Sequence, residues 1–270
     1  MRSRQLRICL VGWGAVARRM VDILGADDPR SIRIVAVAVR DSLKPRHPIP
    51  EGSRLIGSPE ALRDMDVDMV IEAADRTAVE PWASVGLRHA EAVAISSTSA
   101  LGDDLALARL LGIARECGSQ LVIPAGALGG LGVLSAASAL PLHDVTHAIS
   151  KPPAAWRGTR AEELVDLGRL TSAVTFFTGT ARTAAAQFPQ NANVAVISAL
   201  AGVGLDRTRL DLIADPGLGR NMHRVSASGA FGRLDFQVEN EPLPGNPKSS
   251  EMTALSLARL ARNRVAPLVH

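Results

Sequence analysis

The sequence predicts an α/β fold with an N-terminal domain around a parallel sheet and a second, α+β domain built on a mixed or antiparallel sheet. Two observations predict it. Over the first half of the chain, short β-branched apolar runs alternate with helical patterns, which is typical of βαβ units. Beyond residue 126 the strand-like runs no longer have regular helices between them. The chain therefore holds two kinds of sheet.

The elements expected in the first half follow this alternation. Strands are expected over residues 7–11, 32–39, 68–73, 92–96 and 120–124, and helices over residues 15–24, 79–89 and 103–116. A further short helix begins at Ser58-Pro59-Glu60, where serine caps and proline takes the first helical position. The strands are apolar on both faces, so we expect helices on either side of the sheet.

The second half has longer strand-like stretches and fewer helices. Strands are expected over residues 146–150, 173–177, 182–185, 224–228 and 233–239, and helices over residues 132–140, 193–203 and 250–262. We therefore expect one domain over residues 1–125 and another over residues 126–245. The C-terminal segment 246–270 is expected to pack back on the first domain through its amphipathic helix.

Composition excludes several classes of protein. The 270 residues are 47% hydrophobic, and 30 basic against 27 acidic residues give a net charge of +3, which argues against a nucleic-acid binder. Cys9 and Cys117 are too few for a disulfide framework and have no metal-ligand spacing, so no metal is expected. No apolar run reaches the roughly 18 residues of a membrane span. With no signal-peptide pattern at the N-terminus, we expect a cytoplasmic protein.

A glycine-rich turn follows the first strand and opens the first helix. Residues 12–17 read Gly-Trp-Gly-Ala-Val-Ala, a G-x-G-x-x-A pattern. The first glycine permits the tight turn, the second lets a pyrophosphate approach the backbone, and the small third residue lets helix and strand pack closely. The pattern predicts a Rossmann domain that binds a dinucleotide through Gly12, Gly14, Ala15 and Val16. The alternative is a plain tight turn.

The end of the second strand decides the cofactor in such domains, and here it reads Val39-Arg40-Asp41. An acidic residue at this place holds the ribose of NAD, whereas an arginine accommodates the 2′-phosphate of NADP. We expect Arg40 to contact the cofactor and both NAD and NADP to be usable. A solvated Arg40–Asp41 pair on a loop is the alternative.

Absent residues narrow the choice among dehydrogenases. The chain has no tyrosine, so the Tyr-x-x-x-Lys pair of short-chain dehydrogenases is excluded. Its two isolated cysteines exclude the zinc-dependent alcohol dehydrogenases. The second half instead carries several dense motifs: Gly-Ala-Leu-Gly-Gly-Leu at 126–131, Phe-Pro-Gln-Asn-Ala-Asn-Val-Ala at 188–195, Asn-Met-His at 221–223, Glu-Asn-Glu-Pro at 239–242 and Asn-Pro-Lys-Ser-Ser at 246–250. Together these motifs resemble the L-aspartate dehydrogenase family.

The resemblance covers most of the chain and implies a reaction. The family oxidatively deaminates L-aspartate with NAD or NADP, through iminoaspartate, to oxaloacetate and ammonia. Carried over motif by motif, it implies that His223 is catalytic and that Ala127 and Asn193 contact the cofactor. It also implies a homodimer, formed through the open face of the second sheet, which needs cover.

The reaction sets requirements of its own. The substrate amine must lose a proton before hydride leaves, and the imine must gain water, which suits a histidine that titrates near neutrality. Two substrate carboxylates need cationic partners. Lys151 and Lys248 are the candidates; alternatively Lys248 is solvated and Ser249 only caps the following helix. His147 lies four residues from Lys151 on the same strand face, which makes that pair a second substrate-contact candidate.

Two other readings compete with this one. A homoserine dehydrogenase or a dihydrodipicolinate reductase shares the domain layout, but the Asn-x-His and Phe-Pro-x-Asn-x-Asn segments fit them poorly. A catalytically silent NAD(P)-binding regulator would keep Gly12 and Gly14 without needing His223, Asn193 and Lys248. The sequence leaves the physiological direction open among aspartate breakdown, ammonia assimilation and supply of iminoaspartate for NAD biosynthesis.

Overall fold

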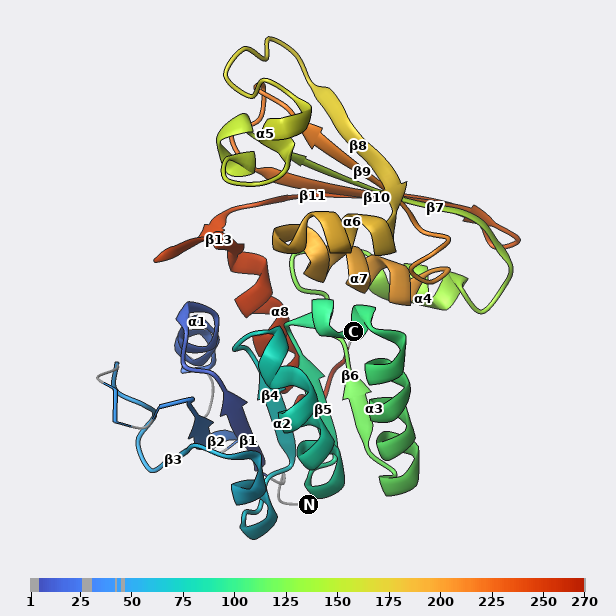
Figure 1. Ribbon diagram of the computed structural model, residues 1–270. Coiled ribbons are helices and arrows are strands. Elements are labelled where there is room, and N and C mark those ends of the chain that lie inside the picture. The colour runs from blue at the N-terminus through green and yellow to red at the C-terminus, as the bar shows by residue number, and fades with distance from the viewer. Residues whose placement is uncertain (1–4, 26–30, 42, 45–46, 270) are drawn as a thin grey trace. The chain divides into compact units, whose positions relative to one another are not determined.

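The computed structural model describes residues 5–25, 31–41, 43–44 and 47–269 (Figure 1). The chain divides into two compact units. Unit 1 comprises Met1–Pro124, Leu243–Ser249 and Thr253–His270, and unit 2 comprises Ala125–Pro242 and Ser250–Met252. Among the described residues, no helix combines the length and the apolar character that crossing a bilayer requires.

Unit 1 is built on a six-stranded parallel sheet with the order β3-β2-β1-β4-β5-β6. The strands are β1 (Leu6–Val11), β2 (Ile32–Ala38), β3 (Arg54–Ile56), β4 (Met69–Glu72), β5 (Ala92–Ile95) and β6 (Gln120–Val122). The chain runs outward from β1 on one side and resumes with β4 on the other. The carboxyl ends of β1 and β4 therefore flank a topological switch point, where open α/β sheets bind ligands.

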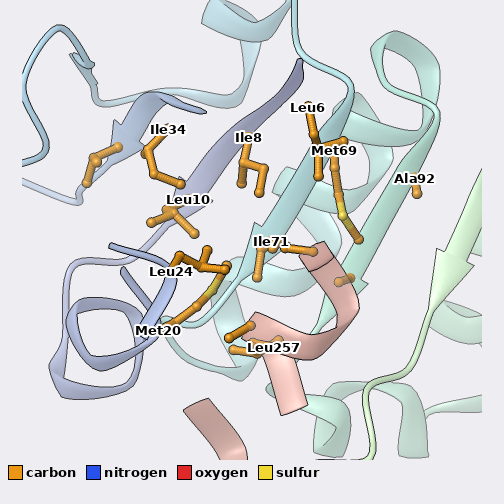
Figure 2. Packing of buried hydrophobic residues seen from close by; sticks show 14 residues of the cluster. Leu6, Ile8, Leu10, Met20, Leu24, Ile34, Met69, Ile71, Ala92 and Leu257 are labelled. Carbon is orange, nitrogen blue, oxygen red and sulfur yellow. The ribbon is translucent and has the colours of Figure 1, made fainter. Parts of the chain in front are cut away.

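Helices cover both faces of this sheet. They are α1 (Ala15–Leu24), α2 (Arg76–His89), α3 (Asp104–Cys117) and α8 (Glu251–Asn263), with the 3-10 helices η1 (Pro59–Asp64) and η2 (Thr98–Gly102). On one face, Met20 of α1 and Leu257 of α8 pack with Leu10 and Ile71 (Figure 2). On the other, Gly86 lets α2 approach the strands closely. A Cβ there would stand 2.9 Å from Val93.

Unit 2 is built on a five-stranded mixed sheet with the order β11-β10-β7-β9-β8. The strands are β7 (Leu142–Lys151), β8 (Val174–Thr180), β9 (Arg209–Ala214), β10 (Asn221–Gly229) and β11 (Gly232–Asn240). Only β7 and β9 pair in parallel. Figure 1 shows α4 (Leu131–Ala137), α6 (Ala181–Gln187) and α7 (Ala192–Ala201) along one face of this sheet. The predicted fold class is confirmed.

The remaining elements of the chain are short. They are η3 (Pro153–Trp156), α5 (Ala161–Leu164), η4 (Pro189–Asn191), β12 (Pro242–Leu243) and β13 (Asn246–Ser250). The sequence placed residues 246–250 before the last helix without a strand, whereas β12 and β13 form a two-stranded sheet of their own.

One prediction in unit 2 is wrong, and one strand was missed. Residues 182–185 form part of helix α6, because alanine is the best helix former and Thr180 caps the helix by accepting from the Thr183 N–H. Strand β9 was not predicted. Its alternation of buried Leu210, Leu212 and Ala214 with more exposed residues is the period-2 pattern of a half-buried strand.

Candidate active site

A cavity of about 480 Å³ lies at the carboxyl ends of the unit 1 strands. It is lined by the glycine turn, the end of β2 and the start of α2, including Gly12, Trp13, Gly14, Arg40, Ala74 and Asp75. Of the predicted cofactor residues, Gly12, Gly14 and Arg40 line it. Ala15 and Val16 form the first turn of α1, next to the lining in the chain but outside it.

The two glycines serve this cavity in different ways. Gly12 has φ +95°, and a Cβ on it would stand 2.8 Å from the Ala73 carbonyl oxygen, so only glycine fits. A Cβ on Gly14 would meet nothing within 4 Å. Gly14 is also the N-cap of α1, whose first N–H groups receive no side-chain cap. Uncapped N–H groups at a helix start suit a pyrophosphate, so these residues fit a dinucleotide cofactor.

The wall of the cavity carries one ion pair. The Arg40 guanidinium Nη2 lies 2.6 Å from Oδ2 of Asp75. Asp75 in turn caps α2, since its Oδ1 accepts from the Thr77 N–H at 2.8 Å. Hydrogen bonds from Thr77 and the charge of Arg40 lower the pKa of Asp75. Arg40 therefore faces the cavity with a carboxylate beside it.

A buried carboxylate that the sequence analysis missed lies at the end of β4. Glu72 has no exposed surface, and its carboxylate accepts from the Ala74 N–H at 2.8 Å, the Ser97 N–H at 2.9 Å and the Ser97 hydroxyl at 2.8 Å. Burial raises its pKa against these hydrogen bonds. Glu72 thus ties the loop after β4 to the loop after β5.

In unit 2, the strand register gathers three candidate site residues on one face of the sheet. His223 on β10 pairs with Ile149 on β7. Side chains alternate along a strand, so His147 and Lys151, two residues to either side of Ile149, share the face of His223. Both are its diagonal neighbours. Of these side chains, His223 and Lys151 were predicted as site residues, and His147 as part of a pair with Lys151.

The two histidines are in direct contact. Nε2 of His147 lies 3.2 Å from Nδ1 of His223, and Nδ1 of His147 lies 2.9 Å from the Ser198 hydroxyl on α7. Burial lowers the pKa of His147 to about 3. Burial, with the neighbouring His147 and Lys151, lowers that of His223 well below its ordinary value. Both rings are therefore neutral near pH 7. Protein partners occupy both nitrogens of His147, so the predicted substrate contact through it has no free ring atom.

Lys151 is a largely buried cation. Its ammonium donates to the Asn191 side-chain oxygen and lies 5.1 Å from the centre of the Trp156 ring. Burial lowers its pKa to about 8. Across the described part of the chain, no carboxylate pairs with it. A buried charge is costly without a partner, so this ammonium is suited to an incoming anion.

The other predicted residues lie outside strands β7 and β10. Ala127 is buried in the turn before α4, and its carbonyl oxygen accepts from Asn240 at 3.0 Å. Asn193 is exposed on α7. Lys248 is exposed on β13 and belongs to unit 1. Ser250, not Ser249, caps α8, since its hydroxyl oxygen accepts from the Met252 N–H at 3.1 Å.

The glycines of residues 126–130 have a packing role of their own. Gly130 has φ +66° and forms the N-cap of α4. A Cβ on Gly130 would lie 2.7 Å or less from three ring carbons of Phe236 on β11. The turn is therefore glycine-rich because it packs closely against β11. A motif comparison alone does not reveal this packing.

The Rossmann sheet with its cavity at the topological switch point, and a histidine beside an ammonium group, point to a nicotinamide-dependent oxidoreductase as the class of protein. Comparison with known proteins narrows this class. Residues 132–264 match the model "Aspartate dehydrogenase, C-terminal", and residues 12–124 match "Homoserine dehydrogenase, NAD binding domain". The functional side chains of unit 2 fall within the first of these matches.

Full-length relatives agree with that match. The L-aspartate dehydrogenase of Brucella anthropi is 52% identical, over 97% of each chain. That of Ruegeria pomeroyi is 40% identical, over 98% of this chain and 94% of its own. The crystal structure of aspartate dehydrogenase from Thermotoga maritima superposes with a TM-score of 0.76 at 26% identity, covering 98% of this chain and 99% of its own. The chain belongs to the L-aspartate dehydrogenase family, as the motifs predicted, and its enzyme class and NAD(P) cofactor class are confirmed with it.

Proposed function

We propose that the protein catalyses the NAD(P)-dependent oxidative deamination of L-aspartate to oxaloacetate and ammonia through iminoaspartate, and the reverse amination. The observation that carries this proposal is the row of His147, His223 and Lys151 on one face of the unit 2 sheet. It places a neutral base beside a cation that has no carboxylate partner among the residues that the structure describes. An amino dicarboxylate needs both.

We propose different roles for the two units. Unit 1 binds the cofactor through Gly12, Gly14 and Arg40, and Ala127 and Asn193 of unit 2 add the contacts that the family resemblance implies. When bound, the nicotinamide accepts hydride from the substrate Cα. The protein must then accept the proton of the substrate ammonium and bind the substrate carboxylates. We assign both roles to side chains of unit 2.

His223 is proposed as the catalytic base. A neutral imidazole can take the proton of the substrate ammonium, so that the amine lone pair is free when hydride leaves, and it can activate the water that attacks the imine. The sequence predicts a histidine that titrates near neutrality, whereas burial lowers the pKa of His223 well below its ordinary value. The shift favours the neutral form at physiological pH. A positioned base of this kind contributes typically 10²–10⁴-fold to the rate.

Lys151 is proposed to bind one substrate carboxylate. The ammonium has three N–H donors, of which the Asn191 oxygen takes one. A carboxylate that reached it would gain a charge-assisted hydrogen bond in a low-dielectric setting. Lys248 remains a proposed second partner and is supported only by its motif, since its side chain is exposed.

The test is a spectrophotometric assay at 340 nm with oxaloacetate, ammonium and either NADH or NADPH. We expect oxidation of the reduced cofactor only when oxaloacetate and ammonium are both present. Oxidation with oxaloacetate alone would indicate a hydroxyacid dehydrogenase instead. Tight NADH binding without any turnover would support the silent regulator.

We also propose a homodimer through the face of the unit 2 sheet opposite α4, α6 and α7. That face carries charged and polar side chains in paired sets, among them Arg224, whose guanidinium Nη2 lies 2.8 Å from Asp235. Such pairing limits the cost of burying charges in an interface. Light scattering should give twice the mass of the chain, and a monomer would contradict the proposal. The cytoplasmic location stays a prediction of the sequence.

A further inference from the structure

A continuous chain of polar atoms leads from the proposed base into helix α7. Nδ1 of His223 lies 3.2 Å from Nε2 of His147, and Nδ1 of His147 lies 2.9 Å from the Ser198 hydroxyl oxygen. That hydroxyl oxygen also lies 3.1 Å from the Ala195 carbonyl oxygen. His147 and Ser198 have no exposed surface, and His223 is 5% exposed. Water therefore does not compete for these atoms.

Counting protons along this chain distinguishes its two arrangements. A serine hydroxyl has one proton, and a neutral imidazole has one N–H and one acceptor nitrogen. If Ser198 donates to the Ala195 carbonyl, it accepts from the Nδ1–H of His147. The Nε2 of His147 then accepts from the Nδ1–H of His223. All three contacts are hydrogen bonds in this arrangement.

The reverse arrangement makes fewer bonds. If Ser198 donates to His147 instead, the Ala195 contact is lost, and His147 donates through Nε2 to the bare Nδ1 of His223. Only two of the three contacts are then hydrogen bonds. Buried polar atoms favour the arrangement that satisfies more of them.

We infer that Ser198 and His147 are positioning residues that hold His223 in the Nδ1–H tautomer, leaving Nε2 as the atom that takes up the substrate proton. The inference rests on the proposed function of His223 and deepens it by naming the reacting atom. When His223 gains a proton at Nε2, its Nδ1–H bond to His147 persists, so the relay need not rearrange during the reaction. An orienting group that fixes the tautomer of a catalytic histidine works in this way.

The environment of His147 and His223 favours neutral imidazole rings. Burial lowers the pKa of both histidines. The charged side chain that acts on His223 in addition is Lys151, on the same face of β7, and it disfavours a further proton. Ser198 also lies in a helix that is otherwise rich in alanine, valine and isoleucine. A mid-helix serine has a lower helix propensity than alanine, and here its hydroxyl meets a buried histidine.

Nitrogen NMR of histidine-labelled protein tests the tautomer without any turnover. Each neutral tautomer gives its own pattern of protonated and bare ring nitrogens, and the signals are assigned from the His147→Gln and His223→Gln variants. We expect Nδ1–H and bare Nε2 in both rings. A bare Nδ1 with Nε2–H in His223 would overturn the inference.

Kinetics test the consequence. Ser198→Ala removes the acceptor of the His147 Nδ1–H, so we expect kcat to fall by about tenfold with little change in KM, as for the loss of an outer hydrogen-bond partner. The same signals should show His223 as a mixture of tautomers. Ser150→Ala is the matched control, because Ser150 is also buried but lies on the opposite face of β7. An unchanged kcat and tautomer in Ser198→Ala would overturn the inference.

A second pair of variants separates positioning from packing. His147→Gln keeps an amide oxygen that can accept the His223 Nδ1–H, whereas His147→Leu keeps the bulk without an acceptor. We expect the glutamine variant to retain several-fold more kcat than the leucine variant, and equal values would contradict a positioning role. If the wild-type protein shows no aspartate turnover, the proposed function fails, while the NMR result still decides the tautomer.

Discussion

The cofactor cavity of unit 1 and the histidine row of unit 2 are built from different parts of the chain. The cavity owes its main feature to the backbone: a bare turn at Gly12 and Gly14 and the uncapped start of α1. The histidine row consists of side chains from β7, β10 and α7, whose direct contacts join residues 51 and 76 positions apart. The glycine turn is a local arrangement, whereas the histidine row depends on long-range contacts.

This difference between a backbone site and a side-chain site predicts which kind of substitution damages each. A backbone site fails when a side chain is added, because the added atoms occupy the space of the ligand or of the fold. A side-chain site fails when a functional group is removed, and its fold survives. Substitutions of both kinds can therefore separate cofactor binding from chemistry.

The largest effect is expected from removing the proposed base. His223→Ala should lower kcat by 10²–10⁴-fold, the range for loss of a general base, while NADH binding, followed by fluorescence titration, stays unchanged. His143→Ala, at an exposed position on the same sheet, is the control. A wild-type kcat in His223→Ala would exclude the role of this residue.

The second effect concerns the backbone of unit 1. Gly12→Ala should lower the free energy of unfolding by about 2–3 kcal/mol, because φ is +95° and the new Cβ would stand 2.8 Å from the Ala73 carbonyl oxygen. Gly14→Ala should leave stability nearly unchanged, since φ is −83° and the space is open. Its methyl group faces the cavity, however, and should raise the Kd for NADH by roughly tenfold.

Urea unfolding and NADH titration of the two glycine variants check this contrast. Equal losses of stability in both variants would mean that Gly14 is required by the fold. In that case its openness to the cavity would no longer support a cofactor contact.

The third effect is a pH dependence from the buried histidine. His147 has a pKa of about 3 in the folded protein against an ordinary value of 6.5. Below pH 6.5 the unfolded chain binds a proton that the folded chain does not. Stability should therefore fall as the pH drops from 6.5 towards 3, by up to about 1.4 kcal/mol per pH unit for this group. The lowered pKa of His223 changes the free energy of unfolding with pH in the same direction.

Glu72 in unit 1 should contribute with the opposite sign. The raised pKa of Glu72 makes its contribution greatest below its ordinary pKa and smaller as the pH rises through the folded value. Urea unfolding at pH 7, 6 and 5 should show a shallower pH slope for His147→Gln than for wild type. His143→Gln serves as the control, and an unchanged slope in His147→Gln would contradict the assignment.

The smallest effect is expected at the side-chain pair in the cavity wall. Arg40 is largely exposed, so its interaction with a 2′-phosphate is screened by solvent. Arg40→Ala should raise the KM for NADP about two- to fivefold more than the KM for NAD. Arg109→Ala removes an exposed arginine that is paired with Glu80 outside the cavity and is the matched control. Equal changes in KM for both cofactors would mean that Arg40 does not contact the 2′-phosphate.

The same contrast explains what the sequence could predict. The glycine turn is contiguous, and each of its residues has a steric reason that can be read locally, so strand, turn and helix were all predicted. The carboxylate of Glu72 was missed because its partner Ser97 lies 25 residues further on. Only the assembled sheet shows that the two loops meet.

In unit 2, less of the candidate site could be predicted from the sequence. His223 was identified through its motif, and Lys151 because lysine is rare in this chain. Ser198 had no such signal, since a serine in an apolar helix is unremarkable until His147 is placed against it. The strand predicted at residues 182–185 failed for a related reason. The β-branched Thr183 favours a strand, whereas the alanine run and its cap Thr180, which lies just outside the segment, favour a helix.

The carboxylate of Glu72 also bears on how a ligand is received. It fixes the Ala74 N–H at 2.8 Å, and the peptide between Ala73 and Ala74 is the one that crowds Gly12. The floor of the cavity is thus ordered by the fold before any ligand arrives. Binding of a dinucleotide then carries little entropic cost for ordering this loop.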